Sequence, residues 1–383
     1  MFMKKMMLVF NVCLLTVIVL LPVSCKQRMT VGGSDRGDTL ELKHSKLLTM
    51  VIHDGYTEVK ISNPWHKGSL LHTYILVDKN RSLPADLPSG TVVRTPLEKS
   101  VVFTTAHASL LGMIGARNQI GGVADLKYML LPDIKKMVVE GRVADCGDAM
   151  SPNIEKIVDM GADAVLLSPF DNSGGYGRVE EIGIPIIECA DYMELSALAR
   201  AEWMKFYGML YGRLHEAESL YDEVCREYVR LKALAKESDV SMSMITEKMT
   251  GSAWYVAGGK SSVGQLIVDA NGKYAFSENK NSGSIAMSFE KVLDKAGDAD
   301  VWVFNHYSYT PMSYSQLEKE HHGYKSFKAF KTHNIYYVNS SQVPYFEEVS
   351  FRPDYLLRDF IILLHPDLAR RLGKLRYYRK VVE

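Results

Sequence analysis

Residues 153–169 read NIEKIVDMGADAVLLSP, and residues 288–305 read SFEKVLDKAGDADVWVFN. Each stretch predicts a short amphipathic helix that opens on Asn or Ser, carries Glu-Lys in its first turn, and is followed by an aspartate and a buried apolar strand. The same helix-strand unit in two distant parts of the chain indicates two related α/β lobes.

The sequence on either side of these units has the same rhythm. From Val92 to Cys189, short apolar runs alternate with helical segments, and the alternation resumes after Ser238. This pattern predicts parallel sheets wrapped by helices. Residues 193–237 are helical throughout, with a break expected at Gly208 and Gly212, because glycine disfavours a helix interior. The predicted fold is therefore α/β, with two Rossmann-like lobes joined by one long helix.

The first residues predict export. The chain opens MFMKK and continues without charge through residues 6–24, as a signal peptide does. An uncleaved membrane anchor is the alternative, since the run is almost long enough to span a bilayer. Ser24 before Cys25, with Leu21 and Val23 nearby, resembles the lipobox of bacterial lipoproteins, although Pro22 stands where leucine is usual. The resemblance implies that Cys25 becomes the acylated first residue of a protein on the periplasmic side of a bacterial membrane.

Composition and turn signals give the expected domain boundaries. Residues 26–38 are polar and glycine-rich, as flexible tethers are. YTEVKIS and LLHTYILVD flank the turn-forming NPWHKG and predict a β-hairpin. The expected order is a signal peptide at 1–24, a lipid-anchored tether at 25–46, a β-hairpin extension at 47–91, an N-terminal lobe at 92–192, connecting helices at 193–237 and a C-terminal lobe at 238–383.

Charge and cysteine content exclude some functions. Lys plus Arg equals Asp plus Glu at 45 each, so no overall field attracts nucleic acid, and no nucleic-acid partner is expected. Cys146, Cys189 and Cys225 lack C-x-x-C spacing. A disulfide between Cys146 and Cys189 and three buried free thiols both remain open.

Motifs for catalysis are missing from the sequence. GGKSS at 258–262 lies between a predicted strand and helix, but Trp254 stands where a phosphate loop begins with glycine. A plain strand-to-helix turn is the favoured interpretation. The sequence has neither G-x-S-x-G nor H-E-x-x-H. We therefore expect no catalytic residues, no metal site, no cofactor and no enzymatic activity.

Aromatic and polar residues follow several predicted strands. Ligands of open α/β sheets bind at the carboxyl ends of strands, and aromatic rings suit a bulky, partly planar ligand. The alternative for each residue is packing in the core. The candidate ligand-binding residues are His107, Phe170, Tyr176, Trp254, Tyr255, His306, Tyr307, Tyr345 and Phe346.

The order of these segments is similar to that of a known family. Residues 92–368 resemble the periplasmic binding proteins of iron-chelate and vitamin B12 ABC importers. The resemblance lies in the order of VVFTTAHASLLGMIGARNQIGGV, the N-x-E-K-I-V unit, GIPIIE, a helical connector and a repeat of the same kinds of segment. The resemblance implies two lobes bridged by a rigid helix, with the ligand between them. It also implies that Glu155 and Glu290 meet arginines of a membrane permease. The helix dipole alone would also favour glutamate at these positions.

The expected function follows from this resemblance. It implies a monomeric, lipid-anchored solute-binding protein that captures an iron chelate (ferric siderophore or haem) or cobalamin and delivers it to an ABC permease. For haem, His107, His306, Tyr307 or Tyr345 could be an axial ligand. The alternatives are an exported chelatase-like enzyme acting on tetrapyrroles, on the same scaffold, and a ligand-sensing receptor domain.

Overall fold

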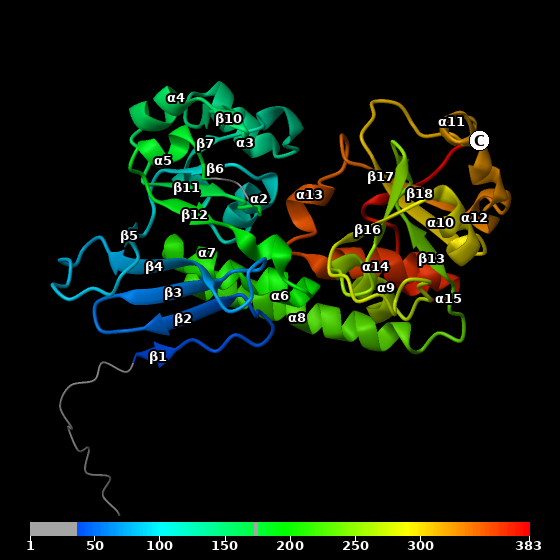
Figure 1. Ribbon diagram of the computed structural model, residues 1–383, viewed down its shortest axis with the longest axis horizontal. Helices are drawn as coiled ribbons and strands as arrows, with labels where there is room; N and C mark the ends of the chain where they lie inside the picture. Colours follow the sequence, from blue (N-terminus) through cyan, green and yellow to red (C-terminus); the bar gives the residue numbers. More distant parts are fainter. Residues whose placement is uncertain (1–36, 172–174) are drawn as a thin grey trace, which may run out of the picture. The chain divides into compact units, whose positions relative to one another are not determined.

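The computed structural model describes residues 37–171 and 175–383 (Figure 1). Residues 37–383 form a compact unit of their own, which contains the buried hydrophobic clusters. The predicted signal peptide and Cys25 lie outside the described residues. Within the described part of the chain, no helix is long and apolar enough to cross a membrane.

The N-terminal lobe contains a five-stranded parallel sheet in the order β12-β11-β6-β7-β8. All four residues of β7 and all four of β11 are buried, as expected for a sheet covered on both faces. The strands are β6 (Ser100–Val102), β7 (Ile120–Val123), β8 (Ala144–Asp145), β11 (Ala164–Leu167) and β12 (Ile186–Glu188), and a small ribbon pairs β9 (Gly147–Asp148) with β10 (Ser151–Pro152). The helices are α2 (Thr105–Met113), α3 (Pro132–Val139), α4 (Ile154–Asp159) and α5 (Arg178–Glu181), with 3-10 turns η1 (Arg117–Gln119) and η2 (Leu126–Tyr128).

The C-terminal lobe contains two sheets. The larger has the order β13-β17-β18-β19, with β19 antiparallel, and the smaller is the antiparallel sheet β14-β15-β16. The strands are β13 (Met244–Thr246), β14 (Met249–Thr250), β15 (Ala253–Ala257), β16 (Ser284–Met287), β17 (Val301–His306), β18 (Ile335–Asn339) and β19 (Tyr378–Lys380). The helices are α9 (Ser262–Asp269), α10 (Phe289–Ala296), α11 (Tyr314–Glu320), α12 (Lys328–Lys331), α13 (Tyr345–Glu348), α14 (Pro353–Leu364) and α15 (Pro366–Leu372), with the 3-10 turn η4 (His322–Ser326). The predicted α/β class with two lobes is confirmed.

The repeated sequence unit forms the same structure twice. In the N-terminal lobe α4 leads to β11, and in the C-terminal lobe α10 leads to β17. Asn153 and Ser288 cap these helices, each accepting the backbone N–H three residues ahead, at 3.0 and 3.4 Å. These side-chain caps satisfy N–H groups that have no partner within the helix, which explains why the helices begin at these residues.

Helices connect the lobes. They are η3 (Ala190–Met193), α6 (Ala197–Glu202), α7 (Met204–Leu210) and the 22-residue α8 (Leu214–Ala235). The chain breaks at Gly212, whose φ of 64° suits glycine. Gly208 lies inside α7, where a Cβ would come within 2.7 Å of the Ala217 side chain, so it allows close packing rather than a break. The first half of α8 packs in the N-terminal core and the second half in the C-terminal core.

The segment before the N-terminal lobe is a five-stranded sheet rather than an isolated hairpin. β3 (Thr57–Ser62) and β4 (Leu70–Asp78) pair antiparallel, as expected for the hairpin. They are joined by β1 (Asp38–Thr39), β2 (Leu48–Ile52) and β5 (Thr91–Thr95), and β5 is parallel to β4. Apolar side chains of the sheet share a core cluster with α7, so the sheet is built onto the N-terminal lobe.

The predicted tether is wrong in its last part, because the described residues before residue 47 belong to the fold. Two buried carboxylates of the connector region hold the segment Lys43–Leu47. Glu202 accepts the backbone N–H of Lys43, His44 and Ser45 at 2.7–2.9 Å, and Glu194 accepts those of Lys46 and Leu47 at 3.1–3.2 Å. Burial would raise the pKa of Glu202, but these N–H donors lower it.

The cysteines in the described residues are free thiols. Cys146 and Cys189 are buried and Cys225 is partly buried. The alternative of a disulfide between Cys146 and Cys189 is wrong.

Candidate ligand-binding cleft

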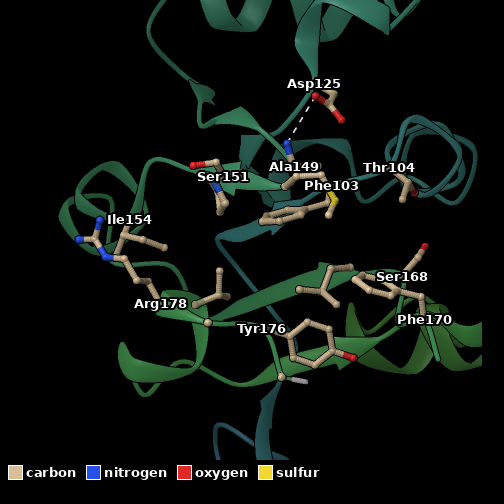
Figure 2. A pocket seen from close by; sticks show the side chains of 16 residues that line it. Phe103, Thr104, Asp125, Ala149, Ser151, Ile154, Ser168, Phe170, Tyr176 and Arg178 are labelled. Carbon is tan, nitrogen blue, oxygen red and sulfur yellow. Dashed lines mark hydrogen bonds between the residues drawn. The ribbon is translucent and has the colours of Figure 1, made fainter. Parts of the chain in front are cut away.

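A cavity of about 590 Å³ lies at the carboxyl ends of the N-terminal lobe strands (Figure 2). We call it the aromatic cavity. It lies between the ends of β6 and β11, the turn from β9 to β10 and the first residues of α4 and α5. Its lining includes Phe103, Phe170, Tyr176, Ile154, Arg178 and Asp125. Its size is in the range of small-molecule sites.

The aromatic cavity offers mainly ring and aliphatic surface. Figure 2 shows the rings of Phe103, Phe170 and Tyr176 around it. Phe170 is 49% exposed, so part of its ring is open to contact with a ligand. Arg178 and Asp125 are the charged residues among the described ones that line the cavity. Such a cavity can bind an apolar or planar group and leaves two charges to orient it.

A second cavity, of about 390 Å³, is lined by both lobes. We call it the polar cavity. Thr104 and Thr105 come from the N-terminal lobe, and Asn305 comes from β17 of the C-terminal lobe. Its lining further includes Arg200, Ser262, Tyr345, Phe346 and Ser350. Thr104 also lines the aromatic cavity, so the two cavities adjoin at this residue.

The lobes are in contact beside the cavities, among other places at Glu347 and at Tyr128. The buried Glu347 of α13 accepts hydrogen bonds from the Thr105 hydroxyl at 2.9 Å and from the Leu130 backbone N–H at 2.8 Å. This places α13 against α2 (Figure 1). Tyr128 of η2 meets Tyr307 edge to face, with ring centroids 6.0 Å apart. The cleft is therefore bounded by a buried polar contact and an exposed aromatic one.

A buried ionic cluster connects α2, through His107, to Asp191 of η3. His107 Nε2 lies 2.8 Å from Asp191 Oδ1, which also accepts the Tyr207 hydroxyl at 2.8 Å, and Arg200 Nε donates to Asp191 Oδ2 at 3.1 Å. Burial alone would lower the pKa of His107, but the Cys189 sulfur and the Asp191 carboxylate raise it to about 10. Burial would raise the pKa of Asp191, but the His107 charge and its hydrogen bonds lower it to about 2.

Four of the predicted ligand-binding residues line a cavity. Phe170 and Tyr176 line the aromatic cavity, and Tyr345 and Phe346 line the polar cavity. They come from both lobes, and Thr104 connects the two cavities that they line.

Two predicted ligand-binding residues are core residues instead, and these predictions are wrong. Trp254 is fully buried within β15, packs against Trp302 and Phe327, and donates its indole N–H to the Thr246 carbonyl. His107 is 3% exposed and points into the ionic cluster. The helix that follows β6 turns this histidine away from the strand end.

Three predicted residues line neither cavity in the described structure. Tyr255 is 47% exposed on β15, on the face opposite Trp254. His306 is partly buried at the end of β17, where burial lowers its pKa. Tyr307 contributes its ring to the contact between the lobes. Its hydroxyl lies 3.3 Å from the hydroxyl of Tyr309. Their role as ligand contacts stays a prediction.

The sequence did not indicate several residues of the cleft. Phe103 lies directly after β6 and could have been found by the strand-end rule. Tyr128 and Arg200 lie in a 3-10 turn and in a connector helix, so no strand end pointed to them. Their place in the cleft depends on how the two lobes pack.

Glu155 and Glu290 occupy equivalent positions in the repeat. Each is the exposed second residue of its helix, α4 or α10. The pKa of Glu290 is lowered by hydrogen bonds from the backbone N–H of Glu290 itself and from the Ser288 hydroxyl. Both side chains can therefore present a carboxylate to a partner.

The GGKSS stretch is a tight turn, as favoured from its sequence. It connects β15 to α9, and Ser261 caps the helix. A Cβ at Gly259 would lie 2.3 Å from the Ser277 carbonyl oxygen and 2.5 Å from that of Asn279. Glycine is therefore needed here for the turn to pack against the segment 276–279, which accounts for the glycine without a phosphate.

Two α/β lobes, a helical connector, a cavity at the strand ends of the N-terminal lobe and an adjoining cavity lined by both lobes are the features of a bilobal solute-binding protein. The model of the periplasmic binding protein family matches residues 101–341, more than half of the chain, and the chain belongs to this family. The resemblance to importer binding proteins is confirmed, and the chain is a binding protein rather than an enzyme.

Relatives and solved structures agree with this family. An uncharacterised lipoprotein of Methanocaldococcus jannaschii is 24% identical over 405 residues, covering 95% of this chain and 94% of the relative. A possible iron-binding, periplasmic solute-binding protein of Staphylococcus epidermidis has a TM-score of 0.56 at 18% identity, covering 70% of this chain and 99% of that one. The periplasmic vitamin B12 binding protein of Vibrio cholerae has a TM-score of 0.52 at 12% identity, covering 72% and 99%. Identities this low show a shared fold alone.

Proposed function

We propose that the chain captures an iron chelate, such as a ferric siderophore or haem, or a cobalamin, and delivers it to a membrane permease. The observation that carries this proposal is the aromatic cavity at the strand ends, adjoining a cavity lined by both lobes. A metal chelate is large and partly planar, and it needs contact area more than direct metal ligands. The names of the similar iron-binding and vitamin B12 binding proteins support the same class of ligand.

A bare metal ion is a poorer candidate. Among the described residues, no group of three or more His, Cys, Asp or Glu side chains could hold a metal ion. Ions held directly by protein need several such ligands at bonding distance. The proposed ligand therefore brings its own chelating atoms.

Ligand screening tests the proposal. The chain from Gly37 onwards, which is a compact unit, is melted with ferric siderophores, haem and cobalamins. We expect one of these classes to raise the melting temperature, since a ligand at 100 times its Kd adds about 2.7 kcal/mol of stability. Phe170→Ala should weaken that binding, because it removes a ring from the aromatic cavity.

The control is Val229→Ala, which shortens an exposed apolar side chain of α8 outside both cavities and should leave binding unchanged. If none of the three classes changes the melting temperature, the proposed ligand class is wrong. If Phe170→Ala binds as tightly as the wild type, the ligand binds elsewhere.

We also propose that Glu155 and Glu290 dock the protein on its permease and that a lipid on Cys25 holds it to the membrane. Two exposed carboxylates at equivalent helix positions, one per lobe, can steer docking to basic residues. The related Methanocaldococcus jannaschii protein is named a lipoprotein, which supports an anchor.

One cellular experiment addresses both membrane contacts. In cells that carry the permease, uptake should fall at least tenfold in the Glu155→Ala, Glu290→Ala double variant while ligand affinity of the purified protein persists. Unchanged uptake would leave only the helix-dipole explanation of these glutamates. Mass spectrometry of protein from the same cells should show a lipid on Cys25, and an unmodified cysteine would contradict the anchor.

A further inference from the structure

The polar cavity contains an arginine whose guanidinium has N–H donors without a partner in the described part of the chain. Arg200 donates its Nε to Asp191, but no hydrogen bond within the described part of the chain involves its two terminal nitrogens. Its side chain is 28% exposed, and it lines the cavity. Of the described residues in that lining, Arg200 is the one with a charge.

The ionic cluster behind Arg200 adds positive charge. Asp191 supplies one negative charge, and it is shared by the His107 imidazolium and the Arg200 guanidinium. The three groups together therefore carry a net positive charge when His107 is protonated. Because His107 and Asp191 are almost fully buried, this excess is available to a ligand only through Arg200.

The N-termini of two helices add further positive potential to the polar cavity. The first residues of α2 come from the N-terminal lobe and those of α9 from the C-terminal lobe, and both helices have at least eight residues. Helix N-termini carry partial positive charge and free N–H groups. The hydroxyls of Ser262 and Ser350 supply further donors along the lining.

The acidic side chains nearby are turned to other partners. Glu347 accepts the Thr105 hydroxyl and the Leu130 N–H, and Glu247 accepts the Asn305 amide at 3.2 Å. Burial raises the pKa of Glu247. Neither side chain is part of the lining of the polar cavity.

We propose that the polar cavity is a subsite for an anionic oxygen group of the ligand, a carboxylate or a phosphate, bound by the terminal nitrogens of Arg200. The inference rests on the proposed function, and it narrows the ligand class to chelates that carry such a group. Guanidinium binds both anions through paired N–H donors. The adjoining aromatic cavity then holds the bulk of the chelate, and Thr104 lies where the two parts of the ligand meet.

Small probes test the subsite without the full ligand. The chain from Gly37 onwards is titrated by calorimetry with citrate, with its neutral trimethyl ester, and with inorganic phosphate. We expect citrate to bind and the ester to fail, and the phosphate arm shows whether the subsite accepts both anions. Arg200→Gln should raise the Kd for the bound anion about 10-fold to 100-fold, the range for loss of a charge-assisted hydrogen bond.

Further variants protect the test against misfolding. Arg200→Lys keeps the charge beside Asp191 and should retain part of the affinity, since an ammonium cannot bind in paired fashion. Ser262→Asp adds a negative charge to the lining at the start of α9, where the helix dipole favours it, and should also weaken binding of the anion by at least tenfold. Arg178→Gln tests the alternative that the anion binds in the aromatic cavity. Arg371→Gln, on the surface and outside both cavities, is the control and should have no effect.

The outcomes separate the subsite from the proposed function. If neither anion binds, or if Arg200→Gln binds it as tightly as the wild type, the subsite is refuted. A loss of affinity in Arg178→Gln alone would show that the anion binds in the aromatic cavity, and this result would also refute the subsite. In either case, a chelate that still raises the melting temperature leaves the proposed function intact.

Discussion

Replacing Asp191 with alanine is expected to lower the free energy of unfolding by about 3–5 kcal/mol, as when one partner of a buried ion pair is removed. The carboxylate is 1% exposed and is shared by His107, Tyr207 and Arg200. Without it, two cationic groups and a hydroxyl lose their common acceptor. Denaturant unfolding followed by fluorescence measures the change.

A surface ion pair is the control for this variant. Glu237 and Arg371 are both more than half exposed, and water screens such pairs. Glu237→Ala should therefore leave the unfolding midpoint almost unchanged. Equal effects of Asp191→Ala and Glu237→Ala would show that the buried cluster does not stabilise the fold.

The same cluster predicts how stability depends on pH. The folded pKa of His107 is raised from 6.5 to about 10, so its contribution is complete below pH 6.5 and is lost as the pH rises through about 10. The folded pKa of Asp191 is lowered from 3.8 to about 2, so its contribution is present above pH 3.8 and is lost as the pH falls through about 2. Asp191→Ala should remove the acidic slope and weaken the alkaline one, to which the Cys189 sulfur also contributes. An unchanged pH profile would contradict this assignment.

Trp254→Ala is expected to destabilise the protein by about 3–5 kcal/mol, as large-to-small changes of buried aromatic residues do. The indole is fully buried, its ring centroid lies 5.4 Å from those of both Trp302 and Phe327, and its N–H donates to Thr246. The substitution leaves a cavity and an unpaired carbonyl group. Thermal and denaturant unfolding both report the loss.

Tyr255→Ala is the control for the stability loss of Trp254→Ala. It is the next residue on β15 and is 47% exposed, so Tyr255→Ala should cost far less stability than Trp254→Ala. A Trp254→Ala variant that is as stable as Tyr255→Ala, and binds chelates less well, would restore Trp254 as a cleft residue.

These two neighbours show what the sequence can and cannot predict. Capping residues, helix-strand units and buried strands are local signals, so the repeat around Asn153 and Ser288 was predicted correctly. Strand-end aromatics are a weaker signal, because one residue of register decides whether a ring points into the core or out of it. Trp254 points inward and Tyr255 outward on the same strand.

Interactions between distant residues account for the other differences. The end of the tether depends on Glu194 and Glu202, which lie about 150 residues further along the chain. Arg200 lines the polar cavity together with the first residues of α2 and α9, which come from different lobes. No local pattern contains this information, since burial of these side chains follows from packing of the lobes.

The hydrogen bonds of Glu347 have a consequence for the motion of the lobes. Two bodies joined at one place can rotate about several axes, and each further attachment restricts that rotation. Helix α8 is one attachment, because it packs in both cores, and Glu347 with Thr105 and Leu130 is another, beside the edge-to-face contact of Tyr128 with Tyr307. The cleft therefore opens with few degrees of freedom, so little conformational entropy is lost when a ligand fills it.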